Sequence, residues 1–233
     1  IPMIGNIGHS SMPSQLVVHE RPRSQVSESF RSVRANLKYF IGDGKTEKKV
    51  YLITSSISGE GKTFCSINLA LTFASTGKKP LLLGADMRKP TLSDYLDLRD
   101  SKGLSNYLAG FNDDVHELIL NPFTENFYVL MGGNIPPNPA ELLASEKMGE
   151  LMQQFRKDFD YIIIDTPPIG LVSDAMELTK YSDLNFLVVR QGRTFKSALH
   201  NMSEMYNDGK VKNMVIIFND INFNKYTYGY GGY

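Results

Sequence analysis

The chain lacks the features that mark secreted, membrane-spanning and zinc-dependent proteins. Cys65 is the one cysteine among 233 residues; this excludes a framework of internal disulfides and fits a reducing compartment. No run approaches the roughly 20 apolar residues that cross a bilayer, and no signal peptide is visible. The histidines are scattered and form no metal-ligand pattern. They stand at positions 9, 19, 116 and 200.

Charge of one sign is also lacking. The 25 basic residues balance the 25 acidic ones, so no global field favours nucleic acid as a partner. What is present is the composition of an ordinary globular protein, with 42% hydrophobic and 21% charged residues. A chain of this length has room for one large α/β domain or two small ones.

Short apolar runs recur along the chain without alternating with polar residues, which is typical of strands buried on both faces of a parallel sheet. Helical patterns lie between these runs. The alternation predicts an α/β fold, a mostly parallel β-sheet flanked by helices on both faces. The predicted strands are residues 49–54, 80–84, 127–131, 161–165, 185–189 and 213–218, and the predicted helices are residues 62–76, 140–156, 173–180 and 195–208.

The two ends of the chain differ from this core, which we place at residues 25–220. Residues 1–24 are rich in Pro, Ser and Gly, so we expect a loosely ordered, extended lead-in. Residues 27–40 carry four apolar residues on one stripe, which predicts an amphipathic helix. Residues 221–233 hold four tyrosines among glycines without an apolar pattern, which predicts a flexible tail.

The segment SISGEGKT, residues 56–63, is similar to a phosphate-binding loop, which reads G-x-x-x-x-G-K-[ST] between a strand and a helix. Ser56 stands at the first glycine position, whereas Gly61, Lys62 and Thr63 match. Glycines at 59 and 61 let backbone N–H groups turn toward an anion at the helix N-terminus. We expect Lys62 to contact the β- and γ-phosphates and Thr63 to bind Mg²⁺. The alternative is a plain glycine turn before a helix.

The loop makes the predicted fold P-loop NTPase-like and defines a nucleotide site. Asn219 joins that site because it follows a strand where related ATPases contact the base, although a turn-forming Asn is equally plausible. Arg190, which ends another strand, faces either the nucleotide or a neighbour. The predicted cofactor-binding residues are Ser58, Gly59, Glu60, Gly61, Lys62, Thr63, Phe64 and Asn219.

Two aspartates come at or just after the ends of predicted strands. Asp165 ends an apolar run as the acidic residue of a Walker B strand does, and Asp86 follows another run. Ligands of open α/β sheets bind at the carboxyl ends of the strands. We therefore expect Thr63, Asp86 and Asp165 to hold the metal, and Lys62, Asp86, Asp165 and Arg88 to act in catalysis. A turn cap for Asp165 and a salt-bridged turn around Asp86 are the alternatives.

Five stretches together resemble the bacterial protein-tyrosine kinases (BY-kinases) of capsule and exopolysaccharide assembly. The most specific are ESFRSVR, with its E-x-x-R-x-x-R pattern, and GGNIPPNPAELLAS. The matching residues span nearly the whole chain from residue 28. The five stretches cover residues 28–34, 55–63, 81–90, 132–145 and 161–168.

The resemblance implies an autokinase that uses ATP and Mg²⁺ to phosphorylate C-terminal tyrosines of neighbouring subunits in a ring-shaped homo-oligomer, an octamer in the family. Glu28, Arg31 and Arg34 are similar to the family's ring contact, and lie on roughly one helix face. A solvated charged face with an internal Glu–Arg pair is the bland alternative, and a frayed terminus is the alternative for the tail. The implied phosphoacceptors are Tyr226, Tyr228, Tyr230 and Tyr233.

The resemblance also implies a location and a partner. Family members act at the cytoplasmic face of the bacterial inner membrane, with a membrane-spanning activator or chain-length-control domain in the same or a separate chain. Residues 1–8 look like the segment that follows such a protein's last membrane span. We therefore expect a soluble fragment that regulates capsule or exopolysaccharide synthesis and export, without a nucleic-acid partner.

One departure keeps other functions open. The family's motif Asp-x-Asp-x-Arg begins here with Gly84, whereas Asp86 and Arg88 remain. Tyrosine has an ordinary pKa near 10, so its hydroxyl needs help at neutral pH; either Asp86 or Asp165 takes the role of the base, or the rate is low. The alternatives are a nucleotide-switched assembly module and a partition or septum-positioning ATPase. The signature lysine of those ATPases falls at Ile57, which cannot replace it.

Overall fold

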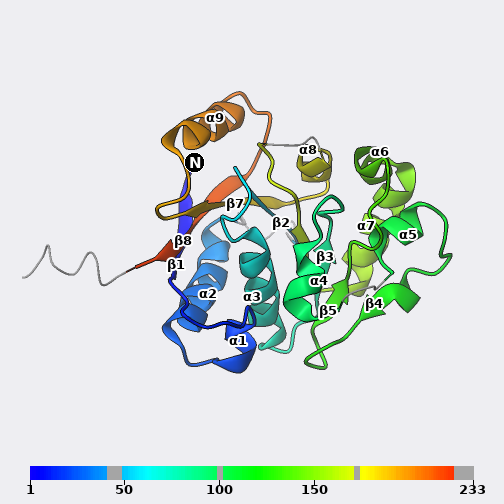
Figure 1. Ribbon diagram of the computed structural model, residues 1–233, viewed down its shortest axis with the longest axis horizontal. Coiled ribbons are helices and arrows are strands. Elements are labelled where there is room, and N and C mark those ends of the chain that lie inside the picture. The colour runs from blue at the N-terminus through cyan, green and yellow to red at the C-terminus, as the bar shows by residue number, and fades with distance from the viewer. Residues whose placement is uncertain (41–48, 99–101, 171–173, 223–233) are drawn as a thin grey trace, which may run out of the picture.

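One sheet runs through the part of the chain that the computed structural model describes, residues 1–40, 49–98, 102–170 and 174–222. Among these residues eight strands are ordered β1-β8-β7-β2-β6-β3-β5-β4 (Figure 1). All neighbours are parallel except β4 and β5. The strands are β1 (Met3–Gly8), β2 (Val50–Ser55), β3 (Pro80–Gly84), β4 (Ile119–Leu120), β5 (Tyr128–Leu130), β6 (Tyr161–Asp165), β7 (Leu184–Arg190) and β8 (Met214–Ile221).

Helices cover both faces of this sheet because successive strand residues point to opposite faces. Tyr51 and Ile53 of β2 pack with α1 to α4, whereas Val50 and Leu52 pack with α5 to α8. Helix α9 covers the same face as α8, over β7 and β8. The helices are α1 (Val17–Glu20), α2 (Gln25–Asn36), α3 (Lys62–Ala74), α4 (Thr91–Leu96), α5 (Leu104–Leu108), α6 (Pro139–Ala144), α7 (Glu146–Asp158), α8 (Asp174–Thr179) and α9 (Lys196–Asn207), with 3₁₀ turns at Leu37–Tyr39 and His116–Leu118.

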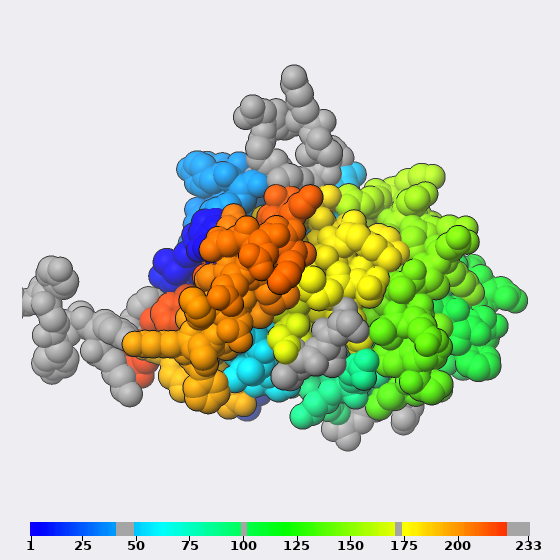
Figure 2. Space-filling model, turned by 90° about the horizontal axis from the view of Figure 1, so that it is seen from above, coloured from blue at the N-terminus to red at the C-terminus, as the bar shows by residue number. Residues whose placement is uncertain are grey.

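The second helical layer forms one broad surface. In the space-filling view, α9 in orange, α8 in yellow and the α6–α7 region in green lie side by side (Figure 2). On the other layer, α2 and α3 run next to each other against the sheet (Figure 1). The chain is therefore an α/β sandwich of three layers, which confirms the predicted fold class.

The phosphate loop lies at the carboxyl end of the central strand β2. Helix α3 begins at Lys62, immediately after Gly61, whose φ of 95° lies in the left-handed region that favours glycine. Strands β6 and β7 flank β2, so Asp165 and Arg190 end on either side of the loop. Parallel pairing thus brings three distant segments to one edge, as expected for this fold.

Three details of the predicted architecture are wrong. Residues 3–8 are not a loose lead-in, because β1 pairs in parallel with β8 at the sheet edge. The helix predicted at 140–156 is two helices, interrupted at Ser145, whose side chain caps α7 by accepting from the Met148 N–H. The helix predicted at 27–40 starts at Gln25, is α-helical to Asn36, and ends in a 3₁₀ turn. The predicted domain boundaries themselves stay a prediction.

Candidate functional site

The phosphate loop is built as a cradle. Gly59 and Gly61 have φ of 82° and 95°, which bends the backbone in a way that side chains disfavour. A Cβ at Gly59 would lie 2.6 Å from the Arg193 guanidinium, and one at Gly61 would collide with Asn219. Over the described ranges, the backbone N–H groups of residues 59–61 make no hydrogen bond. Unpaired N–H groups at a helix N-terminus are suited to bind phosphate.

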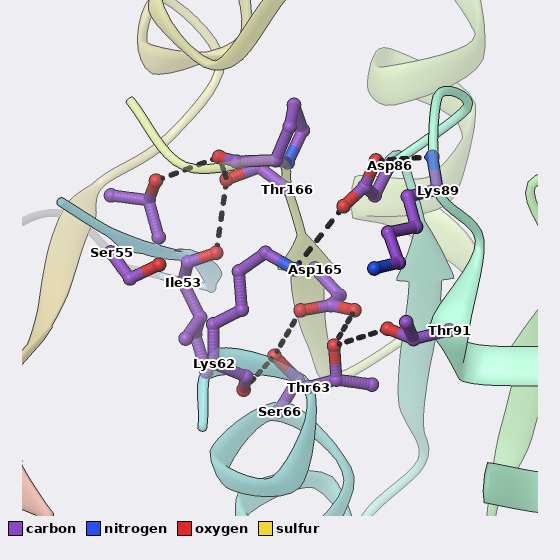
Figure 3. A network of polar contacts seen from close by, with 12 residues as sticks. Ile53, Ser55, Lys62, Thr63, Ser66, Asp86, Lys89, Thr91, Asp165 and Thr166 are labelled. Carbon is purple, nitrogen blue, oxygen red and sulfur yellow. Dashed lines mark hydrogen bonds and ion pairs between the residues drawn. The ribbon is translucent and has the colours of Figure 1, made fainter. Parts of the chain in front are cut away.

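An acidic pair lies beside this cradle, on β6 and just after β3, and we call Asp86 and Asp165 the acid wall. Thr63 Oγ1 donates to Asp165 Oδ2 at 2.9 Å, and Ser66 Oγ donates to Asp165 Oδ1 at 3.0 Å (Figure 3). Lys62 Nζ lies 3.2 Å from Asp86 Oδ2. The structure therefore brings the predicted Lys62, Thr63, Asp86 and Asp165 together.

Burial dominates the electrostatics of Asp165, whose exposed fraction is 1%. Desolvation raises the pKa of the Asp165 carboxyl to about 6, against the opposing influence of Lys62 and the hydroxyls of Thr63 and Ser66. The nearby Asp86 raises this pKa further. Such a perturbed carboxyl at a cleft is typical of a functional site.

Asp86 borders a cavity of about 310 Å³ beside the acid wall. Its Oδ1 accepts from the Lys89 N–H at 3.0 Å (Figure 3). Gly84 lines the same cavity, together with residues 131–135. A Cβ at Gly84 would lie 3.0 Å from both the Gly132 N and Leu92 Cδ2, so the glycine fits a tight place.

The opposite side of the loop is lined by side chains from the ends of β7 and β8, and we call Arg190, Arg193, Thr194 and Asn219 the β7–β8 wall. Each of them hydrogen-bonds a residue of the loop. Arg190 is itself held by Asp220 at 2.8 Å. The sequence predicts Arg190 and Asn219 as separate candidates. It does not predict Arg193 and Thr194, because no motif marks these two residues.

A second cavity, of about 240 Å³, adjoins the loop beyond Gly59 and Gly61. Phe64 and Asn219, both predicted to bind the cofactor, line it together with Tyr95. Gly8 and neighbouring residues of the N-terminal segment complete its wall. An aromatic and amide lining of this kind suits a nucleoside.

Arg88 lies differently from its expected place. Its guanidinium donates to the fully buried carboxylate of Asp174, with Nε–Oδ2 and Nη2–Oδ1 distances of 2.7 and 3.0 Å. This pair raises the pKa of Arg88. A catalytic role for Arg88 stays a prediction, since the structure gives its side chain a structural partner on α8.

On α2, the arginines of the E-x-x-R-x-x-R pattern contact their own chain. Arg31 donates to Glu28 at 2.9 Å and to the Pro22 carbonyl, and Arg34 donates to the Thr72 carbonyl at 2.9 Å. These are the internal contacts of the bland alternative, and the predicted oligomerisation role stays a prediction. The predicted phosphoacceptor tyrosines lie outside the described residues.

Two absences among the described residues bear on metals and membranes. No cluster of three or more His, Cys, Asp or Glu side chains there is arranged to hold a metal ion. No helix among them is both long and apolar enough for a bilayer span. The residues nevertheless fit ATP with Mg²⁺, because Mg²⁺ is usually held by one or two carboxylates, water and the nucleotide's own phosphates. Thr63 and Asp165 would hold the ion, and Lys62 the phosphates.

The fold and the cradle together define a nucleotide-binding protein of the P-loop class. A family model described as an AAA domain matches residues 48–207. Tyrosine-protein kinase YwqD of Bacillus subtilis is 36% identical over 224 residues, covering 96% of this chain and 93% of that protein. Tyrosine-protein kinase CpsD of Streptococcus agalactiae is 37% identical over 215 residues, 91% of this chain and 92% of that protein. The chain belongs to the bacterial tyrosine-protein kinases.

Solved structures agree with this family. The chimerical protein CapA2B2 superposes with a TM-score of 0.87 at 32% identity, covering 95% of both chains. The cell division ATPase MinD of Pyrococcus furiosus gives a TM-score of 0.59 at 25% identity, covering 72% of this chain and 69% of that one. The predicted family and enzyme class are thus confirmed, and the septum-positioning alternative is not favoured.

Proposed function

We propose that this chain is an ATP- and Mg²⁺-dependent kinase that phosphorylates tyrosines in the C-terminal tail of neighbouring copies. One observation carries the proposal: Thr63 of the phosphate loop donates directly to the buried Asp165, while Lys62 reaches Asp86. A metal, phosphates and an acceptor can therefore meet at one point. The proposed acceptors are Tyr226, Tyr228, Tyr230 and Tyr233.

Each residue of the site has a distinct part in this reaction. Mg²⁺–ATP, when bound, supplies the phosphoryl group and neutralises part of its charge. Lys62 and the loop N–H groups hold the phosphates, and Thr63 with Asp165 orients the metal. The low exposure of Lys62, 9%, excludes water from its ammonium group and strengthens its field.

Asp86 is the better candidate for the general base. The carboxylate of Asp165 is held by the hydroxyls of Thr63 and Ser66 and would be directed to the metal. One oxygen of Asp86 is held instead by the Lys62 ammonium, which bound phosphates would attract away. Asp86 borders the cavity of about 310 Å³, where a tyrosine side chain has room. The hydroxyl of tyrosine, with a pKa near 10, would transfer its proton to Asp86 as its oxygen bonds to the γ-phosphorus of ATP and the bond from that phosphorus to the leaving ADP breaks. This supports activity without a carboxylate at Gly84.

Assembly and cellular context belong to the same proposal. Glu28, Arg31 and Arg34 contact a neighbour in a ring of identical subunits, and a membrane-spanning partner places the kinase at the cytoplasmic face of the inner membrane for polysaccharide synthesis. One solved relative is a chimera, CapA2B2, which supports a kinase that works with a second polypeptide. Arg31→Ala with Arg34→Ala should give monomers by light scattering with nucleotide binding intact; a persisting oligomer would refute the contact.

Mass spectrometry tests the kinase directly. The purified chain is incubated with ATP and Mg²⁺ beside Lys62→Met and Asp86→Asn, and intact and peptide masses are compared. We expect phosphate on tail tyrosines in the wild type, none in Lys62→Met, and a rate at least about a hundredfold lower in Asp86→Asn. Phosphate in Lys62→Met would mean a contaminating kinase. An unmodified wild-type tail despite bound ATP would refute autonomous kinase activity.

A further inference from the structure

The outward-facing carbonyl groups of the phosphate loop are held by the β7–β8 wall. Ser58 O accepts from Arg193 at 3.0 Å, Gly59 O from Arg190 at 2.9 Å and Glu60 O from Asn219 at 3.0 Å. In a trans peptide, a carbonyl and the next N–H point in opposite directions. Holding these three carbonyls on one side therefore turns the N–H groups of residues 59–61 to the other side, into the cradle.

Inside the loop, the Glu60 carboxylate forms a second anchor. It is fully buried and accepts from Ser56 Oγ at 2.9 Å, from the Ile57 N–H at 2.9 Å and from Thr194 Oγ1. Across the described part of the chain, no cation is paired with it. A buried carboxylate without a cation requires its hydrogen-bond donors, so the loop's shape depends on them.

The Thr194 hydroxyl is used in both of its capacities. It donates to Glu60, and it accepts from the Arg190 N–H at 2.8 Å. The Thr194 hydroxyl oxygen therefore makes one hydrogen bond within the turn after β7 and one from that turn to the phosphate loop. Serine reproduces both bonds, whereas valine, of nearly the same shape, makes neither.

We propose that the turn after β7 holds the phosphate loop in its phosphate-binding form. Thr194 and Glu60 are the positioning residues, and Arg193 adds a further bond from the turn to the loop, at the Ser58 carbonyl. The turn fixes the direction of the loop N–H groups before the nucleotide arrives, so binding does not have to order them. The inference rests on the proposed nucleotide site. It concerns the phosphates, because Glu60, Arg193 and Thr194 do not line the nucleoside cavity.

The test is nucleotide binding by Thr194→Val, measured by displacement of a fluorescent ADP analogue. We expect the Kd for ADP to rise about tenfold, since a hydrogen bond to a charged group is lost. The Kd for adenosine should change less than twofold, and Thr194→Ser should restore ADP binding. A merely structural role would weaken ADP and adenosine equally.

Controls keep each outcome decisive. Thr179→Val removes a comparable half-buried hydroxyl, which donates to the Met176 carbonyl at 2.7 Å on α8, and should leave both affinities unchanged. ADP affinity of Thr194→Val within twofold of wild type overturns the proposal. If that variant does not fold, Arg193→Ala, an exposed residue, should weaken ADP about threefold, and unchanged affinity overturns it. Because no phosphoryl transfer is measured, failure of the kinase proposal leaves this readout intact.

Discussion

The two sides of the phosphate loop do opposite work with opposite charge. The acid wall places two buried carboxylates beside Lys62 and Thr63, where we propose that a metal and an acceptor meet. The β7–β8 wall places arginines against the loop, but their donors are directed to carbonyl groups of the chain itself. The presence of a charged side chain near the site therefore does not reveal the role of that side chain, whereas the atoms that the side chain contacts do. In our proposals, the acid wall takes part in the chemistry and the β7–β8 wall holds the shape of the loop.

Breaking the acid wall should have the largest effect. Asp165→Asn should lower the phosphorylation rate at least about a hundredfold, because an amide holds a metal poorly. Affinity for ADP without Mg²⁺ should change less than tenfold. Single-turnover kinetics with labelled ATP, beside a titration with ADP, separate the two. A rate within tenfold of the wild type would show that Asp165 is structural.

Breaking the β7–β8 wall should act on binding instead. Arg190→Gln removes the donor to Gly59 and one partner of Asp220. The KM for ATP should rise roughly three- to tenfold with kcat nearly unchanged, since the loop is still present but less ordered. Steady-state kinetics provide the measurement. A fall in kcat with an unchanged KM would contradict the proposal that the β7–β8 wall acts on nucleotide binding and not on the chemical step.

The acid wall should also be visible in stability without any ligand. The pKa of Asp165 is raised to about 6 in the folded state, against about 4 when unfolded. The folded state therefore binds more protons between these values, and stability falls as pH rises from about 4 to about 6. Over that range, the unfolding free energy of the wild type should fall by about 2 kcal/mol relative to that of Asp165→Asn, which has no carboxyl to titrate at this position.

Urea denaturation at pH 4, 5, 6 and 7 measures this difference in unfolding free energy, with Asp208→Asn, a substitution of an exposed residue, as the control. A constant difference would contradict the shifted carboxyl.

The smallest expected effect concerns Gly84 and its fit beside the acid wall. Gly84→Ala places a Cβ 3.0 Å from the Gly132 N, so unfolding should become easier by about 1–2 kcal/mol. Gly149→Ala is the matched control. It lies within α7 with its new Cβ in ordinary contact at 3.6 Å from Tyr181 Oη, and should stabilise by up to ~1 kcal/mol. Thermal unfolding compares the two, and equal signs would contradict the crowding.

The sequence predicts one wall far better than the other. Gly61, Lys62, Thr63 and Asp165 are local patterns at strand ends, and parallel pairing brings them together as expected. The β7–β8 wall comes from two strands that follow one another late in the chain. Its members contact loop carbonyls or, in the case of Thr194, the Glu60 carboxylate. Contacts between segments this far apart in the sequence leave no local pattern of residue types, so the sequence does not predict Arg193 and Thr194.

The missed strand β1 has a similar cause. Its six residues, MIGNIG, include two glycines and an asparagine, which have low strand propensity. Pairing with β8 and packing on α2 override that propensity. A Cβ at Gly5 would lie 2.7 Å from Val33 Cγ2, so the glycine that weakens the local pattern is what allows the strand to approach α2.

This edge strand has a consequence for the order of folding. Met3 aligns with Ile216, so β1 is synthesised long before its partner and waits for nearly the whole chain. Gly8, at its end, lines the same cavity as Phe64 and Asn219. Docking of β1 therefore completes the wall of that cavity, and a ligand in the cavity stabilises the docked strand by mass action. Docking of β1 and readiness to bind are thus one linked equilibrium.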